Sequence, residues 1–296
     1  MTAKGWCPGV LRPMEVEDGL LVRVKPPMSR LSPEQARAIC DAAEACGSGA
    51  LELTSRANLQ IRGVTEATHA DLVARLDAVG LVDPDKVTEA RRQITVTPLW
   101  SPGAETEALH DRIVAGLGRL PDLPEKLGIA VDTGRAAVLR DASADFRFER
   151  VDDGILLRAD GVEAGRLVTL DTAVDHLVAL AEWFAANKTD GVRRMADLTA
   201  TTEPPEDWRA EPMAHRAGGL VPGTLPNGCV IGVPGGALTA ERLRGLLDEA
   251  SPHGLRLMPG RMILLERVRE YDAPDFISHA FDPRLRSDGA GTNDAA

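Results

Sequence analysis

Residues 51–63 read LELTSRANLQIRG and concentrate the side chains that could bind a ligand. In a strand, alternate residues share a face. The even positions are all polar: Glu52, Thr54, Arg56, Asn58, Gln60 and Arg62. The odd positions include Leu51, Leu53, Leu59 and Ile61. Guanidinium groups bind oxyanions in a bidentate manner, so two of them beside amides predict a cradle for carboxylates. The same pattern also fits a solvated outer face with surface ion pairs.

More basic residues stand at the ends of expected elements: Arg23, Lys25, Arg91, Arg92 and Lys126. Each of them alone is more often a surface charge.

Neither the four cysteines nor the six histidines have the spacing of a metal site. No Cys-x-x-Cys pair occurs, which is typical of reduced cytosolic thiols. The Gly-rich piece at 232–236 is not followed by Gly-Lys-Ser/Thr, and no Gly-x-Ser-x-Gly elbow is present. We therefore predict no metal site and assign no catalytic residue.

Other elements are expected on both sides of the strand at 51–63. The first is a strand at 20–24, which is followed by a turn at Pro26-Pro27. Ser32, Pro33 and Gln35 predict a capped helix start, with Gln35 completing a capping box. That helix ends at Gly47. A second helix is expected at 66–79, followed by a strand at 92–96.

In the middle of the chain, the residue pattern predicts two helices, at 106–117 and 172–186. Short strands are expected between them, at 128–131, 137–139, 155–158 and 167–170. Residues 201–212 are rich in Glu, Pro and Asp, which is typical of a linker.

The early pattern then returns, because 229–268 repeats the strand, turn, helix and Leu-x-Leu order of 20–64. Such self-similarity predicts a duplicated α+β unit, and the strand–helix–strand order is ferredoxin-like. In the second copy Met258, Gly260, Met262 and Leu264 replace Thr54, Arg56, Asn58 and Gln60. The first copy is therefore the candidate for ligand contact.

We divide the chain into four parts: a first ferredoxin-like unit at 1–90, a mixed α/β segment with linker at 91–212, a second ferredoxin-like unit at 213–286, and a disordered tail at 287–296. The expected fold class is α+β, with duplicated ferredoxin-like units and an intervening mixed α/β segment.

Composition excludes some functions. The 296 residues carry a net charge of −11, which disfavours general nucleic-acid binding. No run of about 18 apolar residues and no apolar leader are present, so we expect no membrane span and a cytoplasmic location.

Four segments resemble precorrin-3B synthases, a branch of the sulfite/nitrite reductase superfamily. They are CPGVLRPMEVEDGLLVRV at 7–24, LTSRANLQIRGV at 53–64, LGIAVDTG at 127–134 and FDPRLR at 281–286. The resemblance implies a ferredoxin-like repeat packed with a larger mixed domain. It also implies a tetrapyrrole substrate rich in carboxylates, a 4Fe-4S cluster, iron and dioxygen, with sirohaem in the reductases.

The resemblance implies that Arg23, Arg56, Arg92 and Lys126 hold the substrate anion or tetrapyrrole carboxylates. Arg56 and Arg62 would suit the carboxylates of the substrate. We therefore expect Arg56, Arg62, Arg92 and Lys126 to converge on one cleft.

Departures from the family limit this reading. The family's two cysteine clusters, which ligate the 4Fe-4S centre, have no match, so we expect no cluster or other cofactor bound by this chain. At position 128 this chain has Gly128 where the reductases usually have a basic residue. At position 260 it has Gly260 where the family has an aromatic residue. Three functions remain open: an enzyme component whose iron–sulfur domain lies on a separate chain, a non-catalytic tetrapyrrole-binding or assembly module, and an inactive truncated remnant.

Overall fold

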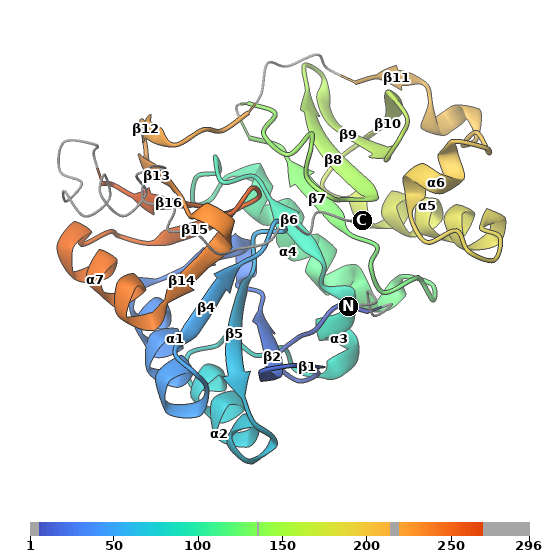
Figure 1. Cartoon of the computed structure of the whole chain (residues 1–296). Helices are drawn as coiled ribbons and strands as arrows, with labels where there is room; N and C mark the ends of the chain where they lie inside the picture. The colour runs from blue at the N-terminus through green and yellow to red at the C-terminus, as the bar shows by residue number, and fades with distance from the viewer. Residues whose placement is uncertain (1–5, 135, 214–218, 269–296) are drawn as a thin grey trace.

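The computed structural model describes residues 6–134, 136–213 and 219–268, and they form three sheets (Figure 1). The first sheet is antiparallel and has the order β1 (Met14–Val16), β2 (Gly19–Val24), β5 (Leu59–Val64), β4 (Ala50–Leu53) and β14 (Ala237–Thr239). The other antiparallel five-stranded sheet has the order β12 (Gly223–Leu225), β13 (Gly228–Gly232), β16 (Met262–Glu266), β15 (Leu255–Met258) and β3 (Arg30–Leu31). The predicted duplication of an α+β unit is confirmed.

The two units exchange one short strand each. β14 belongs to the second copy in sequence but pairs with β4 of the first, with Leu238 opposite Leu51. β3 belongs to the first copy but pairs with β15 of the second, with Leu31 opposite Leu255. The exchange is reciprocal, so each sheet is completed by the other unit.

Three helices bury their apolar faces in one core that both sheets share: α1 (Pro33–Cys46), α2 (Glu66–Asp77) and α7 (Ala240–Ala250). The start of α1 follows the prediction, because the Ser32 side chain accepts from the Gln35 backbone and the Gln35 side chain accepts from the Ser32 backbone. α1 packs against both α2 and α7. A single apolar core therefore joins both units, with Ile39, Ile61 and Leu265 all buried in it.

The middle segment forms a mixed sheet of its own, in the order β11 (Glu211–Pro212), β10 (Ala164–Val168), β9 (Gly154–Ala159), β8 (Phe146–Val151), β7 (Ile129–Asp132) and β6 (Ile94–Val96). Helices α4 (Glu105–Gly116) and α5 (Ala173–Asn187) pack on it and on each other. Two shorter helices are α3 (Lys86–Arg91) and α6 (Met195–Thr199). This unit has a separate core, which contains Phe146, Phe148 and Phe184.

Two predictions for this segment are wrong. Residues 137–139 form no strand, because the backbone N–H groups of Val138 and Leu139 donate to the Asp132 carboxylate, each at 2.8 Å. Residues 201–212 are not only a linker, since Trp208 is buried there and Glu211–Pro212 is a strand. The predicted tail at 287–296 and the FDPRLR segment lie outside the described residues. None of the helices in the described ranges combines the length and apolar character needed to span a bilayer.

Candidate functional site

The polar face of the first sheet is buried. Thr54, Asn58 and Gln60 are each at most 9% exposed. Arg23 of β2 lies opposite Gln60 of β5, so their side chains share this face. The alternative of a solvated outer face is therefore wrong for the centre of the strand.

The N-terminal segment and α3 surround Lys25, at the end of this face. The Glu89 carboxylate of α3 accepts hydrogen bonds from the backbone of Val10 and Leu11, at 2.5 and 3.0 Å. The Lys25 ammonium group donates to the Glu89 carbonyl oxygen at 2.7 Å. Position 9 requires glycine, because a Cβ atom there would clash with the Glu89 carboxylate at 2.0 Å.

Two buried polar atoms on this face have no hydrogen-bond partner among the described residues: Arg23 Nε and Gln60 Oε1. Burial lowers the pKa of Arg23, the nearby Cys7 partly offsets this, and the charge of Arg56 lowers the pKa further. Unpaired buried polar atoms are unfavourable, so they mark a place where water or a ligand would add hydrogen bonds.

Arg56 lies in a tight turn that separates β4 from β5. The Thr54 hydroxyl accepts from the Arg56 and Asn58 backbone, at 3.3 and 3.1 Å, and Ala57 has a φ of 56°. The Arg56 guanidinium donates to the Lys126 carbonyl at 3.3 Å and to the Ser143 hydroxyl at 2.9 Å. Within the described ranges it pairs with no carboxylate, so its charge is available to an anion.

A small pocket brings together residues of the first sheet and the middle unit. Its lining consists of Arg56, Asn58, Arg92, Gln93, Ile94, Thr95, Gly128 and Ser143. Arg92 is held by Asp83, with the two N···O distances at 2.6 and 2.8 Å, and it also donates to the Lys25 carbonyl. Lys126 adjoins the pocket through its carbonyl contact with Arg56. Of the four residues expected to converge, Arg56 and Arg92 line this pocket, and Lys126 reaches it only with its backbone carbonyl.

Arg62 does not join them, and its predicted convergence on this cleft is wrong. It forms an ion pair with Asp18 at 2.7 Å and a longer one with Glu52 at 3.5 Å. The hydrogen bond to Asp18 raises the pKa of Arg62. Its charge is therefore already balanced near the β1–β2 turn.

The sequence analysis missed Asp145, which fixes the middle-unit wall of this pocket. Its carboxylate has no exposed surface and accepts from the backbone of Gly128 and Met195, each at 2.8 Å. It also accepts from Arg194 Nε at 2.9 Å, and Arg194 donates to the Ser143 hydroxyl at 3.0 Å. Ser143 thus joins Arg194 to Arg56. A single Asp before a strand carries no sequence signal for this role.

The second copy has lost the polar face, as the sequence indicates. Val230 lies opposite Leu264, where the first copy has Arg23 opposite Gln60. Both are buried in a small apolar cluster with Met258. A cavity of about 450 Å³ opens there, lined by residues that include Met258, Met262 and Ser143.

Known proteins match this architecture in sequence and in structure. Residues 12–79 match the family model of the nitrite/sulfite reductase ferredoxin-like half domain. This part of the chain is therefore similar to the half domain that nitrite and sulfite reductases share.

Two curated proteins match part of the chain in sequence. A precorrin-3B synthase from a Sinorhizobium species is 33% identical over 163 residues, which cover 50% of this chain and 33% of that protein. A ferredoxin–nitrite reductase from Synechococcus elongatus is 29% identical over 127 residues, which cover 39% of this chain and 25% of that protein. The matched regions thus span a third or less of each relative.

A solved structure of the Mycobacterium tuberculosis NirA protein has the same fold. Its TM-score is 0.61 at 18% identity, with 88% of this chain and 56% of that chain covered. At this identity the match establishes the fold alone.

The superfamily implies an iron–sulfur cluster and sirohaem, and the described residues do not fit the cluster. Cys40, Cys46 and Cys229 are buried and Cys7 is half-buried, and all four are free thiols. Within 6–134, 136–213 and 219–268, no three His, Cys, Asp or Glu side chains are arranged so that they could hold a metal ion. The Arg56 guanidinium and the unpaired Arg23 Nε are donors that do fit the carboxylates of a tetrapyrrole, whereas Gln60 Oε1 requires a donor.

Lys25 makes folding depend on pH in a predictable window. Burial lowers its pKa from 10.5 to about 8, and Glu89 only partly offsets this. Between pH 8 and 10.5 the unfolded state therefore binds more protons at Lys25 than the folded state. The contribution of Lys25 to the free energy of unfolding should therefore rise across this window, as the penalty for burying the charge disappears. Above pH 9 the buried Cys40, whose pKa is raised to about 11, acts in the opposite direction. Urea unfolding at pH 7.5, 8.5 and 9.5 should show this rise, and Lys25→Met should reduce it. Equal pH slopes for both proteins would contradict it.

Proposed function

We propose that this chain binds a carboxylate-rich tetrapyrrole of cobalamin biosynthesis, as a protein resembling precorrin-3B synthase. The observation that carries the proposal is Arg56, a guanidinium that faces a small pocket and bonds only to a carbonyl and a hydroxyl among the described residues. The match to a precorrin-3B synthase supports the choice of a tetrapyrrole.

In this proposal each residue has a simple task. Arg56 exchanges its two neutral acceptors for a carboxylate, because a charge-assisted bidentate bond is the stronger one. Asn58 supplies an amide beside it, and Arg92, whose charge Asp83 already balances, forms a fixed part of the pocket wall. The unpaired Arg23 Nε donates a hydrogen bond to water or to a second polar group, and the unpaired Gln60 Oε1 accepts one.

Oxidation chemistry in the family depends on iron and an iron–sulfur cluster. The described residues supply binding and orientation, and we propose that a separate chain carries the cluster-binding domain. Wild-type protein that binds the tetrapyrrole without turning it over, even with such a partner, would favour a binding or assembly module.

Replacing Arg56 tests the binding site directly. Arg56→Gln keeps a polar side chain but removes the charge, so the affinity for uroporphyrin should fall about tenfold to a hundredfold, given roughly 1.5–3 kcal/mol for a charge-assisted bond. Isothermal titration of the wild type and the variant measures this change.

Arg62→Gln is the matched control, because Arg62 lies on β5, directly after the turn that holds Arg56, but pairs with Asp18 outside the pocket. Its affinity should stay at the wild-type value. If Arg56→Gln and wild type bind equally, or if neither binds, the proposal is wrong. A loss in Arg62→Gln alone would place the ligand at the β1–β2 turn instead.

A further inference from the structure

We propose that a second cavity, between α3 and the segment 120–127, binds a small amphipathic anion with one acidic group on an apolar body. The cavity measures about 420 Å³, which is within the range of small-molecule sites. Its lining consists of Arg12, Lys86, Val87, Ala90, Arg91, Leu120, Pro121, Asp122, Leu123, Pro124, Glu125, Leu127, Ile129 and Phe146.

The interior of this cavity is apolar. Leu120, Leu127, Ile129 and Phe146 lie at its wall and are themselves buried, at most 8% exposed. Val87 of α3 faces them and is 63% exposed, which makes it one of two large exposed hydrophobic residues in the described part of the chain. An exposed apolar side chain beside a concave apolar wall is typical of a binding site. An apolar ligand body would cover Val87.

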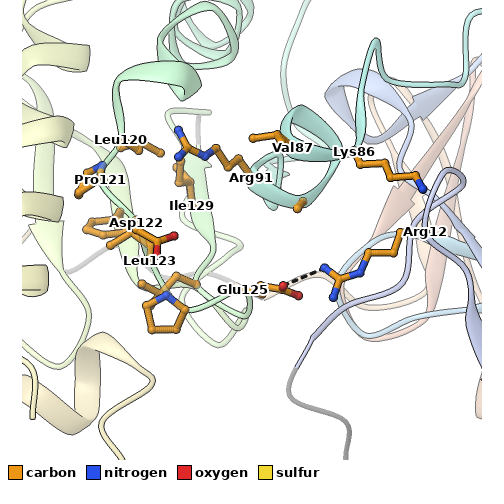
Figure 2. Close-up of a pocket in the computed structure, with 14 residues that line it drawn as sticks. Arg12, Lys86, Val87, Arg91, Leu120, Pro121, Asp122, Leu123, Glu125 and Ile129 are labelled. Carbon is orange, nitrogen blue, oxygen red and sulfur yellow. Dashed lines mark hydrogen bonds and ion pairs between the residues drawn. The ribbon is translucent and has the colours of Figure 1, made fainter. Parts of the chain in front are cut away.

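The mouth of the cavity carries three cations, although the chain as a whole has a net charge of −11. Figure 2 shows Arg12 and Lys86 close together on one side, with Arg91 further along α3. Arg91 is anchored by a 2.9 Å hydrogen bond to the Leu117 carbonyl. The lining also includes the carboxylates of Asp122 and Glu125, so three cations against two carboxylates leave an excess of one positive charge, which favours a singly charged anion.

The Arg12–Glu125 ion pair closes part of this mouth and can be exchanged for a ligand. Its N···O distance is 2.8 Å, and both side chains are about 40% exposed. Exposed ion pairs contribute little to stability, so a ligand acid can replace Glu125 at small cost. The Trp6 ring lies 4.2 Å from the Arg12 guanidinium carbon and supports that group from one face.

This cavity is distinct from the proposed tetrapyrrole site. Neither Arg56 nor Asn58 lines it, and the chain between Leu127 and Ile129 separates the two, with Gly128 lining the other pocket. A failure of one site therefore leaves the other unaffected.

Two fluorescent probes of similar shape test the site: anionic 8-anilinonaphthalene-1-sulfonate and neutral N-phenyl-1-naphthylamine. We expect saturable binding of the anionic probe, displaced by decanoate. Val87→Glu places a carboxylate in the cavity and should weaken the anionic probe about tenfold or more. Arg12→Gln should weaken the anionic probe but not the neutral one, because it removes charge and leaves the apolar wall.

The controls separate this site from other apolar surfaces. Val221→Glu changes the other exposed hydrophobic residue, which is 73% exposed and does not line this cavity, and it should bind as wild type. Arg56→Gln should also bind the probe normally, whatever the fate of the tetrapyrrole site. Unchanged affinity in Val87→Glu, or no saturable binding by wild type, overturns the proposal. Equal losses for both probes in Arg12→Gln overturn its selection of anions.

Discussion

Asp145→Ala is expected to lower the free energy of unfolding by about 3–5 kcal/mol, because it removes a fully buried carboxylate and leaves its hydrogen-bond donors without an acceptor. The carboxylate has no exposed surface and accepts three hydrogen bonds, from Gly128, Met195 and Arg194. Alanine would leave two backbone N–H groups buried without partners and would uncouple α6 from the start of β8.

Urea denaturation at neutral pH measures this loss. Asp141→Ala is the matched control, because Asp141 is exposed and lies four residues away in the same loop. Surface substitutions of this kind usually change stability by about 0.5 kcal/mol or less. A loss below about 1 kcal/mol for Asp145→Ala would mean that water replaces the carboxylate and that the loop does not depend on it.

Gly236→Ala is expected to lower the free energy of unfolding by about 2–4 kcal/mol, combining a left-handed backbone with overpacking. Gly236 has a φ of +79°, and a Cβ there would lie 2.3 Å from the Leu53 carbonyl oxygen. That oxygen belongs to β4, whose neighbour β14 begins at the next residue, Ala237. The substitution therefore pushes the exchanged strand away from the first sheet.

Gly235→Ala is the control for the backbone contribution alone. Gly235 has a φ of +64°, but a Cβ there would meet no other atom within 4 Å, so its substitution should cost only about 1–2 kcal/mol. Thermal unfolding of both variants in parallel gives the comparison. Equal losses would show that the contact with Leu53 relaxes without strain.

Local signals made much of the fold predictable. Ser32 and Gln35 form the expected capping box because both partners lie within one turn of the helix. The duplication was visible because each copy repeats its apolar spacing over some forty residues. The exchanged strands were not predicted, because β3 and β14 have only two and three residues and carry no periodic pattern.

The site was only partly predictable for a different reason. Alternation along 51–63 assigned its residues to two faces, but it could not show that residues 92–95 and Gly128 of the middle segment lie next to Asn58. Arg62 was misplaced because its partner Asp18 is 44 residues away. Asp145 was missed because its partners Gly128 and Arg194 come from distant parts of the chain.

The reciprocal strand exchange has a consequence for how the two units assemble. Each unit offers the other a strand in the manner of a swapped dimer, but both units lie on one polypeptide. Their association is therefore intramolecular, with an effective concentration set by the connecting chain and not by the amount of protein in solution. Dilution, which dissociates a true dimer, leaves this core intact. Because both units are encoded in one chain, their sequences can differ, unlike those of the two subunits in a homodimer. The first unit has Arg23 and Gln60 on its polar face, and the second has the apolar pair Val230 and Leu264.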